Sequence, residues 1–251
     1  MAFAEDSTVL DRVLNPQDAN KRSTIIFLHG LGDDGHGAGY GLAQQFQMYN
    51  KLLHTKWVLP TAKLDNEVGE RCWYKPHDLP SPLKPRVPGD HEVGEVDEEE
   101  DEDGILKTVD LIDGLVEQEI ADGVDPSKIV VGGFSQGCAV STIWGLKGKH
   151  RSKVAGVYGL SGYFPKIKSV NDDALSGTEA KGHAPQWFFA HGMADRAVAT
   201  NLFAEGQKRL QELVDKDKVE GHVYQDLAHT IAGPEIRDIW LWFKKVLKEE
   251  E

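Results

Sequence analysis

The sequence predicts a single-domain α/β fold in which a mainly parallel sheet is flanked by helices. Short runs of apolar and β-branched residues alternate along the chain with segments of helical periodicity, which is typical of α/β proteins. Most of these runs lack the polar alternation of a half-exposed strand, as expected where helices cover both faces of a sheet. The 251 residues, 40% of them hydrophobic, suit one large domain, and no linker divides them.

Six segments are expected to form the strands of this sheet. Each is short, apolar and rich in β-branched or aromatic residues, and most are bounded by glycine, proline or charged residues. The predicted strands are 24–29, 57–60, 128–134, 154–160, 186–192 and 220–226.

Helical periodicity marks the segments between and after these strands. Apolar residues recur every three or four positions through 105–120. A second helix is predicted over 201–214, and a third over 234–247 begins with a proline, which the first turn of a helix tolerates. The segment 61–104 is predicted to be a long loop within the single domain 1–251. We expect its acidic run "EVDEEEDED" (95–103) to be mobile and solvated.

Composition limits the classes of partner and the compartment. The formal net charge is −13, and eight of the acidic residues lie in 95–103, which argues against nucleic acid and anionic membranes as partners of that surface. Two cysteines are too few for a disulfide framework. The N-terminal residues do not resemble a signal peptide, and we expect no transmembrane segment. The sequence therefore predicts a cytoplasmic protein with free thiols.

The segment 133–137, Gly-Phe-Ser-Gln-Gly, matches the pattern G-x-S-x-G around Ser135. A nucleophilic serine of this type lies on a tight turn between a strand and a helix, where its neighbours must be small. Here the predicted strand 128–134 precedes the serine, and the helix-like "QGCAVSTIWGL" follows it. The alternative interpretation is a glycine-rich turn with an incidental serine. The flanking segments favour a catalytic nucleophile.

A serine nucleophile needs a base and an acid that orients the base. Asp195 follows the predicted strand 186–192, and His229 lies after the next strand and before the last helix. The order serine, acid, histidine is the one expected for this architecture. Asp226 is the competing acid, because it is closer to His229 in sequence. His191, at a strand end, is interpreted as a structural histidine.

The oxyanion of the reaction requires two hydrogen-bond donors. The backbone amide of Gln136 is one candidate, because it lies at the start of a helix. The second should come from the glycine-rich segment "FLHGLGDDGHG" (27–37), which follows the first strand. A phosphate-binding role is the alternative for this loop, although it lacks the G-K-[ST] and G-x-G-x-x-G patterns. No cysteine or histidine cluster has metal-ligand spacing, so the sequence predicts no metal.

These motifs resemble those of the acyl-protein thioesterase, lysophospholipase and carboxylesterase family of α/β-hydrolases. The segment 27–37 is similar to the family's HGLGD-x-GHG, and "GGFSQGCA" (132–139) is similar to GGFSQGG. The segments "HGMADRAV" (191–198) and "YQDLAH" (224–229) resemble HG-x-x-D-x-x-V and Y-x-x-x-x-H. The resemblance extends over residues 23–247.

The resemblance implies an α/β-hydrolase fold and a serine-hydrolase mechanism. It implies Ser135 as nucleophile, Asp195 as orienting acid and His229 as base, with the amides of Leu31 and Gln136 as the oxyanion hole. Family members hydrolyse fatty-acyl thioesters on protein cysteines, or oxygen esters of lysophospholipids and small alcohols, without a metal or cofactor. We therefore expect an acylated protein or a small acyl ester as substrate. We also expect a monomer or weak dimer with at most transient contact to a membrane surface.

The chain departs from the family pattern where the substrate would bind. Ala38 replaces a tryptophan, and Ala199 replaces a proline. The segment "CWYKPHD" (72–78) keeps a tryptophan and a second aromatic residue but loses the adjacent aspartate. Together with the prolines and leucines that follow, it suggests an apolar wall for the acyl group, and we predict three substrate-binding residues there: Trp73, Tyr74 and Leu79.

Cys138, just after the motif serine, has two interpretations. A thiol at a helix N-terminus can be acidified and reactive, but a buried cysteine is more often a small packing residue, and we favour packing.

The expected acyl-thioesterase function also has alternatives. One is a small-molecule carboxylesterase, lysophospholipase or lactonase, and another is a non-catalytic ligand receptor on the same scaffold. A receptor would have no need for the serine, the acid and the histidine together, which disfavours it.

Overall fold

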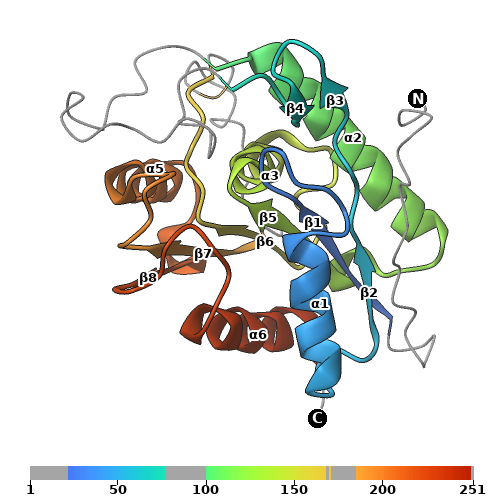
Figure 1. The fold of residues 1–251 in the computed structure, drawn as a ribbon. Helices are drawn as coiled ribbons and strands as arrows, with labels where there is room; N and C mark the ends of the chain where they lie inside the picture. The colour runs from blue at the N-terminus through green and yellow to red at the C-terminus, as the bar shows by residue number, and fades with distance from the viewer. Residues whose placement is uncertain (1–21, 77–99, 168–169, 171–184, 250–251) are drawn as a thin grey trace.

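The computed structural model of the protein describes residues 22–76, 100–167, 170 and 185–249. Its centre is a six-stranded sheet in the spatial order β2–β1–β5–β6–β7–β8, in which every neighbouring pair is parallel (Figure 1). Each of the six predicted strands overlaps one strand of this sheet, and the predicted fold class is confirmed. The strands are β1 (Ser23–Leu28), β2 (Thr55–Val58), β5 (Ile129–Phe134), β6 (Gly156–Leu160), β7 (Gln186–Gly192) and β8 (Val219–Tyr224).

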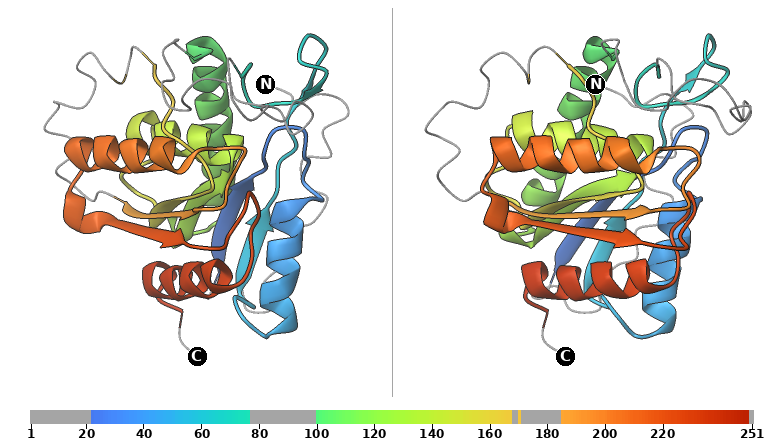
Figure 2. Two further views of the ribbon diagram at one scale, coloured as in Figure 1. Left: turned by 60° about the vertical axis from the view of Figure 1, so that its left-hand side comes forward. Right: turned by 90° about the vertical axis from the view of Figure 1, so that its left-hand side faces the viewer.

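Helices cover both faces of the sheet and divide the core into two layers (Figure 2). One layer lies under α2 (Glu102–Ala121), α3 (Gln136–Lys147) and α5 (Thr200–Leu213). The other lies under α1 (Ala38–Met48) and α6 (Pro234–Leu247). Short 3-10 turns at Pro126–Lys128 and Lys216–Lys218 lead into β5 and β8. No helix in the described part of the chain is long and apolar enough to cross a bilayer.

Helix α1 has no counterpart among the predicted elements. Its sequence contains Gly39 and Gly41, and glycine is a poor helix former. Gly39 is nevertheless required by packing, because a Cβ atom there would collide with the ring of Phe27 on β1. The absence of a side chain lets the helix approach the sheet closely. Tertiary packing therefore overrides local propensity in this segment.

The acidic run 95–103 is partly a structural element, contrary to its prediction as a mobile loop. Residues 95–99 lie outside the described residues. Asp101 caps the N-terminus of α2 by accepting a hydrogen bond from the Gly104 N–H at 3.0 Å, and α2 begins at the next residue. Glu100 is only 5% exposed and accepts a hydrogen bond from the Tyr163 hydroxyl at 2.7 Å. A carboxylate at a helix N-terminus accepts hydrogen bonds from free backbone N–H groups and interacts favourably with the helix dipole, which accounts for the acidic residues at the end of the run.

The predicted loop 61–104 contains a further element, a small antiparallel hairpin of β3 (Leu64–Asp65) and β4 (Glu70–Arg71). It lies beside the loop that follows β1, because the Gly32 N–H donates to the carbonyl of Arg71 at 2.9 Å.

Since the main sheet is parallel, the carboxyl ends of β1, β5, β7 and β8 meet at one edge. Ligands of open α/β sheets bind at this edge, and the loops that carry the predicted site residues leave from it.

Candidate active site

Ser135 lies on the sharp turn between β5 and α3. Its backbone has φ 54° and ψ −116°, a conformation that is strained for a residue with a side chain. The turn is held by a 2.8 Å hydrogen bond from the Ser135 N–H to the carbonyl of Leu160. Gly133 and Gly137 pass so close to the carbonyl oxygen of Leu28 that a Cβ atom at either position would collide with it. These glycines permit the turn that presents the serine hydroxyl.

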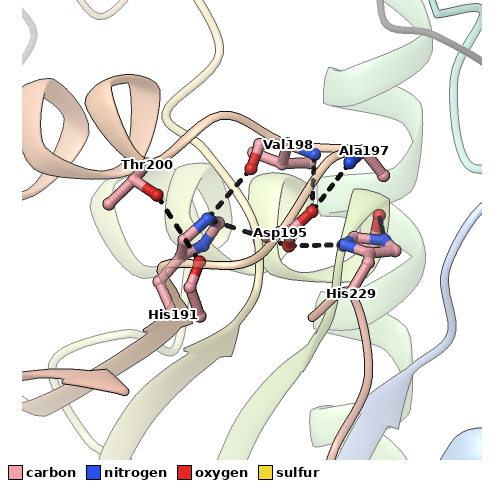
Figure 3. Close-up of polar contacts among 8 residues, drawn as sticks. His191, Asp195, Ala197, Val198, Thr200 and His229 are labelled. Atoms are coloured by element: carbon pink, nitrogen blue, oxygen red, sulfur yellow. Dashed lines mark hydrogen bonds and ion pairs between the residues drawn. The ribbon is translucent and has the colours of Figure 1, made fainter. Parts of the chain in front are cut away.

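The structure brings Ser135, His229 and Asp195 together in one hydrogen-bonded chain. The Nε2 atom of His229 lies 3.0 Å from the Ser135 Oγ. Its Nδ1 atom lies 2.7 Å from Oδ2 of Asp195 (Figure 3). An ionised carboxylate can only accept, so the imidazole proton lies on Nδ1 and Nε2 is free to accept the serine proton. This is the geometry of a serine nucleophile with its base and orienting acid.

Hydrogen bonds on all sides fix the carboxylate of Asp195. Its Oδ1 atom accepts from the backbone N–H groups of Ala197 and Val198 at 2.8 and 2.9 Å. Burial acts to raise the pKa of Asp195, but the hydrogen bond and charge of His229 and the two backbone donors outweigh it. The pKa of Asp195 is therefore lowered, and the group stays ionised. Asp226, the competing acid, is exposed.

His191 lies on the other side of Asp195 from His229 (Figure 3). Its side chain is fully buried, stacks on Phe203 with a centroid distance of 4.9 Å, and donates from Nε2 to the carbonyl of Val198 at 3.0 Å. Burial lowers the pKa of His191, which favours the neutral ring. These contacts agree with the interpretation of His191 as a structural histidine.

Ser135 opens into a cavity whose wall includes both predicted oxyanion residues, Leu31 and Gln136. In the described part of the chain, no acceptor is found for the backbone N–H of either residue. Most of the other N–H groups of the glycine-rich loop are used internally: those of Gly32, Asp33, Gly35, His36, Gly37 and Ala38 donate to protein oxygens. The loop therefore offers few free N–H groups for a phosphate, and the oxyanion interpretation is favoured.

Comparison with known proteins decides the family. A profile of the phospholipase/carboxylesterase family matches residues 10–247. The chain belongs to this family. The acyl-protein thioesterase 1 of Yarrowia lipolytica is 33% identical to it, and the alignment covers 93% of this chain and 96% of the relative. The acyl-protein thioesterase 1 of Saccharomyces cerevisiae is 30% identical, with 90% and 93% covered.

Solved structures support the same fold. SOBER1 of Arabidopsis thaliana superposes with a TM-score of 0.70 and 25% identity, and covers 90% of this chain and 99% of its own. Acyl-protein thioesterase 2 of Zea mays gives a TM-score of 0.69 at 22% identity, with 94% and 98% covered, which supports the fold. The chain therefore has the α/β-hydrolase fold and is a hydrolase of this family.

The substrate-binding residues predicted in the segment 72–78 and just after it are only partly placed in the cavity. Tyr74 contributes to its wall, and Leu79 lies outside the described residues. Trp73 instead donates from its indole Nε1 to the carbonyl of His29 at 2.8 Å, and its ring lies 4.8 Å from that of His29. Trp73 is not among the residues that line the cavity, and its role as an acyl contact stays a prediction. Composition identified an apolar segment, but not the direction in which each side chain points.

Cys138 is 2% exposed and packs closely against Gly159 and Gly162, where an added Cβ atom would collide with its sulfur. Burial raises the pKa of the Cys138 thiol to about 12, so the thiolate is scarce at neutral pH. These properties agree with a packing residue.

Glu235, in the first turn of α6, is a buried acid that the sequence did not single out. Its side chain is fully buried, and in the described part of the chain neither carboxyl oxygen has a hydrogen-bond partner. Burial raises the pKa of Glu235 from 4.5 to about 8. The Ala232 N–H, which lies near the carboxyl group without forming a hydrogen bond of good geometry, opposes this rise, and the charge of Asp195 adds a smaller increase. At neutral pH the group is protonated in the folded protein.

This raised pKa predicts a pH-dependent stability. Below the unfolded pKa the group carries its proton in both states, and its contribution to stability is lost as pH rises through the folded pKa of about 8. Glu235→Gln does not titrate there. The free energy of unfolding of this variant, relative to the original protein, should rise between about pH 5 and about pH 8.5 in urea titrations. A difference that does not change with pH would contradict the buried, protonated acid.

Proposed function

We propose that the protein is a serine hydrolase that removes acyl groups from cysteine thioesters of proteins through an acyl-enzyme on Ser135. The observation that supports this most strongly is the chain of contacts from the Ser135 Oγ to His229 at 3.0 Å and from His229 to Asp195 at 2.7 Å. The thioester class is supported by the relatives named acyl-protein thioesterase 1, which align with nine-tenths of the chain.

In the first half-reaction, the Ser135 Oγ attacks the thioester carbonyl while Nε2 of His229 takes the hydroxyl proton. The resulting imidazolium is stabilised by the ionised Asp195, whose carboxylate contacts Nδ1. The backbone N–H groups of Leu31 and Gln136 receive the negative charge that develops on the carbonyl oxygen. As the C–S bond breaks, the cysteine sulfur takes the proton from His229 and leaves as a thiol, and the acyl group stays on Ser135.

In the second half-reaction, a water molecule takes the place of the departed thiol. His229 accepts a proton from this water, which attacks the acyl carbonyl, and the same oxyanion donors are used again. The tetrahedral intermediate collapses with return of the proton to the Ser135 Oγ. A fatty acid and the free cysteine are the products.

The wall of the cavity suits an acyl group. Besides Tyr74, its apolar lining includes Phe134, Tyr163 and Val198. The hydroxyls of Tyr74 and Tyr163 lie 2.6 Å apart, and that of Tyr163 donates to Glu100. Because both hydroxyls are satisfied within the protein, the rings can contact an acyl chain without leaving a buried polar group unpaired. Burying each methylene contributes about 0.8 kcal/mol at most.

The proposal is tested by a matched panel of substrates. Purified protein should release thiol from an S-acylated peptide, and kcat/KM on acyl thioesters should rise with chain length up to the limit of the cavity. The panel pairs each thioester with the oxygen ester of the same acyl group, below its micelle concentration. Activity confined to short oxygen esters, without thiol release, would reject the thioesterase and favour a small-molecule carboxylesterase.

A further inference from the structure

His29 occupies the position between β1 and the glycine-rich loop and is 1% exposed. Both of its ring nitrogens are engaged. Nε2 lies 2.9 Å from the backbone nitrogen of Ala62, and Nδ1 lies 2.7 Å from the carbonyl oxygen of Gly30. A backbone N–H can only donate, so Nε2 is the acceptor and the proton is on Nδ1, which donates to Gly30. Burial lowers the pKa of His29, which keeps the ring in this neutral form.

The carbonyl of Gly30 and the N–H of Leu31 belong to the same planar peptide unit and point in opposite directions. A hydrogen bond that fixes the carbonyl therefore fixes the N–H as well. We propose that His29 is a positioning residue that orients the Gly30–Leu31 peptide so that the Leu31 N–H serves the oxyanion. This inference rests on the proposed function, in which Leu31 is one of the two oxyanion donors.

Donation from His29 has a second effect on the same peptide. A carbonyl that accepts a hydrogen bond polarises its peptide unit, and the N–H at the other end becomes a better donor. The Asp33 N–H also donates to the Gly30 carbonyl, at 3.2 Å, so His29 supplies the shorter of two hydrogen bonds that hold the Gly30–Leu31 peptide. The imidazole thus acts on the oxyanion through a peptide plane, without touching the substrate.

The Trp73–Tyr74 segment contacts both His29 and Gln136, the residue whose backbone N–H is the other oxyanion donor. Trp73 contacts His29 through the ring and through its indole N–H, which donates to the His29 carbonyl. The side-chain amide of Gln136 accepts from the Trp73 backbone N–H and donates to the Tyr74 carbonyl, each at 2.9 Å. One segment therefore contacts both residues that set the oxyanion hole, His29 and Gln136. These contacts give Trp73 a part in holding the oxyanion hole.

The competing explanation is that His29 only anchors the segment around Ala62. Two substitutions separate these roles, because each keeps one of the two contacts. In His29→Asn the side-chain amide nitrogen can take the place of Nδ1 and donate to Gly30. In His29→Gln the side-chain oxygen can take the place of Nε2 and accept from Ala62, while the donor to Gly30 is lost.

We expect His29→Asn to keep kcat within about tenfold of the original protein and His29→Gln to lower it about 100-fold, as for loss of one oxyanion donor. KM should change little in both variants, because the contact matters in the transition state. Thermal unfolding shows whether each variant is folded. Equal losses, or a larger loss in His29→Asn, would overturn the proposal.

A boronic acid that forms a tetrahedral adduct with the serine provides a second measurement. Its inhibition constant should increase in His29→Gln in parallel with the loss of kcat. The inhibition constant of a non-covalent ether of the same chain length, which places no charged oxygen in the oxyanion hole, should not change. An unchanged boronic acid affinity would overturn the proposal.

Tryptophan substitutions keep the proposal testable if the His29 variants do not fold. Trp73→Phe removes the indole donor to His29, and we expect it to lower kcat several-fold with KM little changed. Trp187→Phe is the matched control, because Trp187 is 1% exposed and its Nε1 has no partner in the described part of the chain. Equal effects of the two changes would overturn the proposal. An original protein without hydrolase activity would instead contradict the proposed function.

Discussion

Ser135→Ala should lower kcat on an acyl thioester on the order of 10⁶-fold, the loss typical of removing a serine nucleophile. The alanine cannot form an acyl-enzyme, so only binding and the oxyanion donors remain to accelerate the direct attack of water. Thermal unfolding should be nearly unchanged, since the fold of the turn depends on Gly133, Gly137 and the backbone of residue 135 rather than on its hydroxyl.

Ser161 offers a matched control for this substitution. It lies just after the adjacent strand β6, has φ 49° against 54° for Ser135, and is fully buried. In the described part of the chain its Oγ has no hydrogen-bond partner. Ser161→Ala should therefore change kcat by less than about threefold, because no contact is lost. A folded Ser135→Ala variant with activity close to that of Ser161→Ala would remove the basis of the proposed mechanism.

Asp195→Asn should lower kcat about 10⁴-fold with little change in stability of the fold. An asparagine can donate to Nδ1 of His229, and the ring proton then lies on Nε2. A protonated Nε2 cannot accept the proton of the Ser135 hydroxyl. The imidazolium of the transition state also loses its counter-charge. The measurement is kcat at neutral pH with a water-soluble thioester.

Asp226→Asn is the control for this second substitution, because Asp226 is the other acid near His229 in sequence. It is exposed, and a change there should lower kcat by less than about threefold. A larger loss in Asp226→Asn than in Asp195→Asn, both folded, would show that the wrong acid has been assigned.

The strands were predictable because a buried parallel strand is a short apolar run, and such runs are recognisable without structural information. Helix α1 was not, because Gly39 and Gly41 lower its propensity and its position depends on tertiary contacts, such as that of Gly39 with Phe27 and that of Phe46 with Trp57. The acidic run was misread for a related reason. Eight acids among nine residues indicate a solvated loop, but the end of this run belongs to α2, which Asp101 caps and which begins three residues before the predicted helix.

The site also contains residues that the sequence predicts and residues that it does not. The positions of Ser135, Asp195 and His229 follow from local motifs and from their order along the chain, and the structure brings the three together. The role of Trp73 does not follow from the sequence, since its indole contacts the His29 carbonyl across 44 positions. His29 carries no distinctive signal outside the glycine-rich motif. Its link to Leu31 depends on which carbonyl its Nδ1 faces, and a sequence does not specify that direction.

The central claim is that Ser135 forms the covalent acyl-enzyme. Its most direct test is mass spectrometry of the protein after reaction with a fluorophosphonate, followed by peptide mapping. We predict a single adduct, located on Ser135, whose formation abolishes thioester hydrolysis and which is absent from Ser135→Ala. An adduct on another residue such as Cys138, or full hydrolytic activity in protein whose Ser135 is completely labelled, would contradict the account.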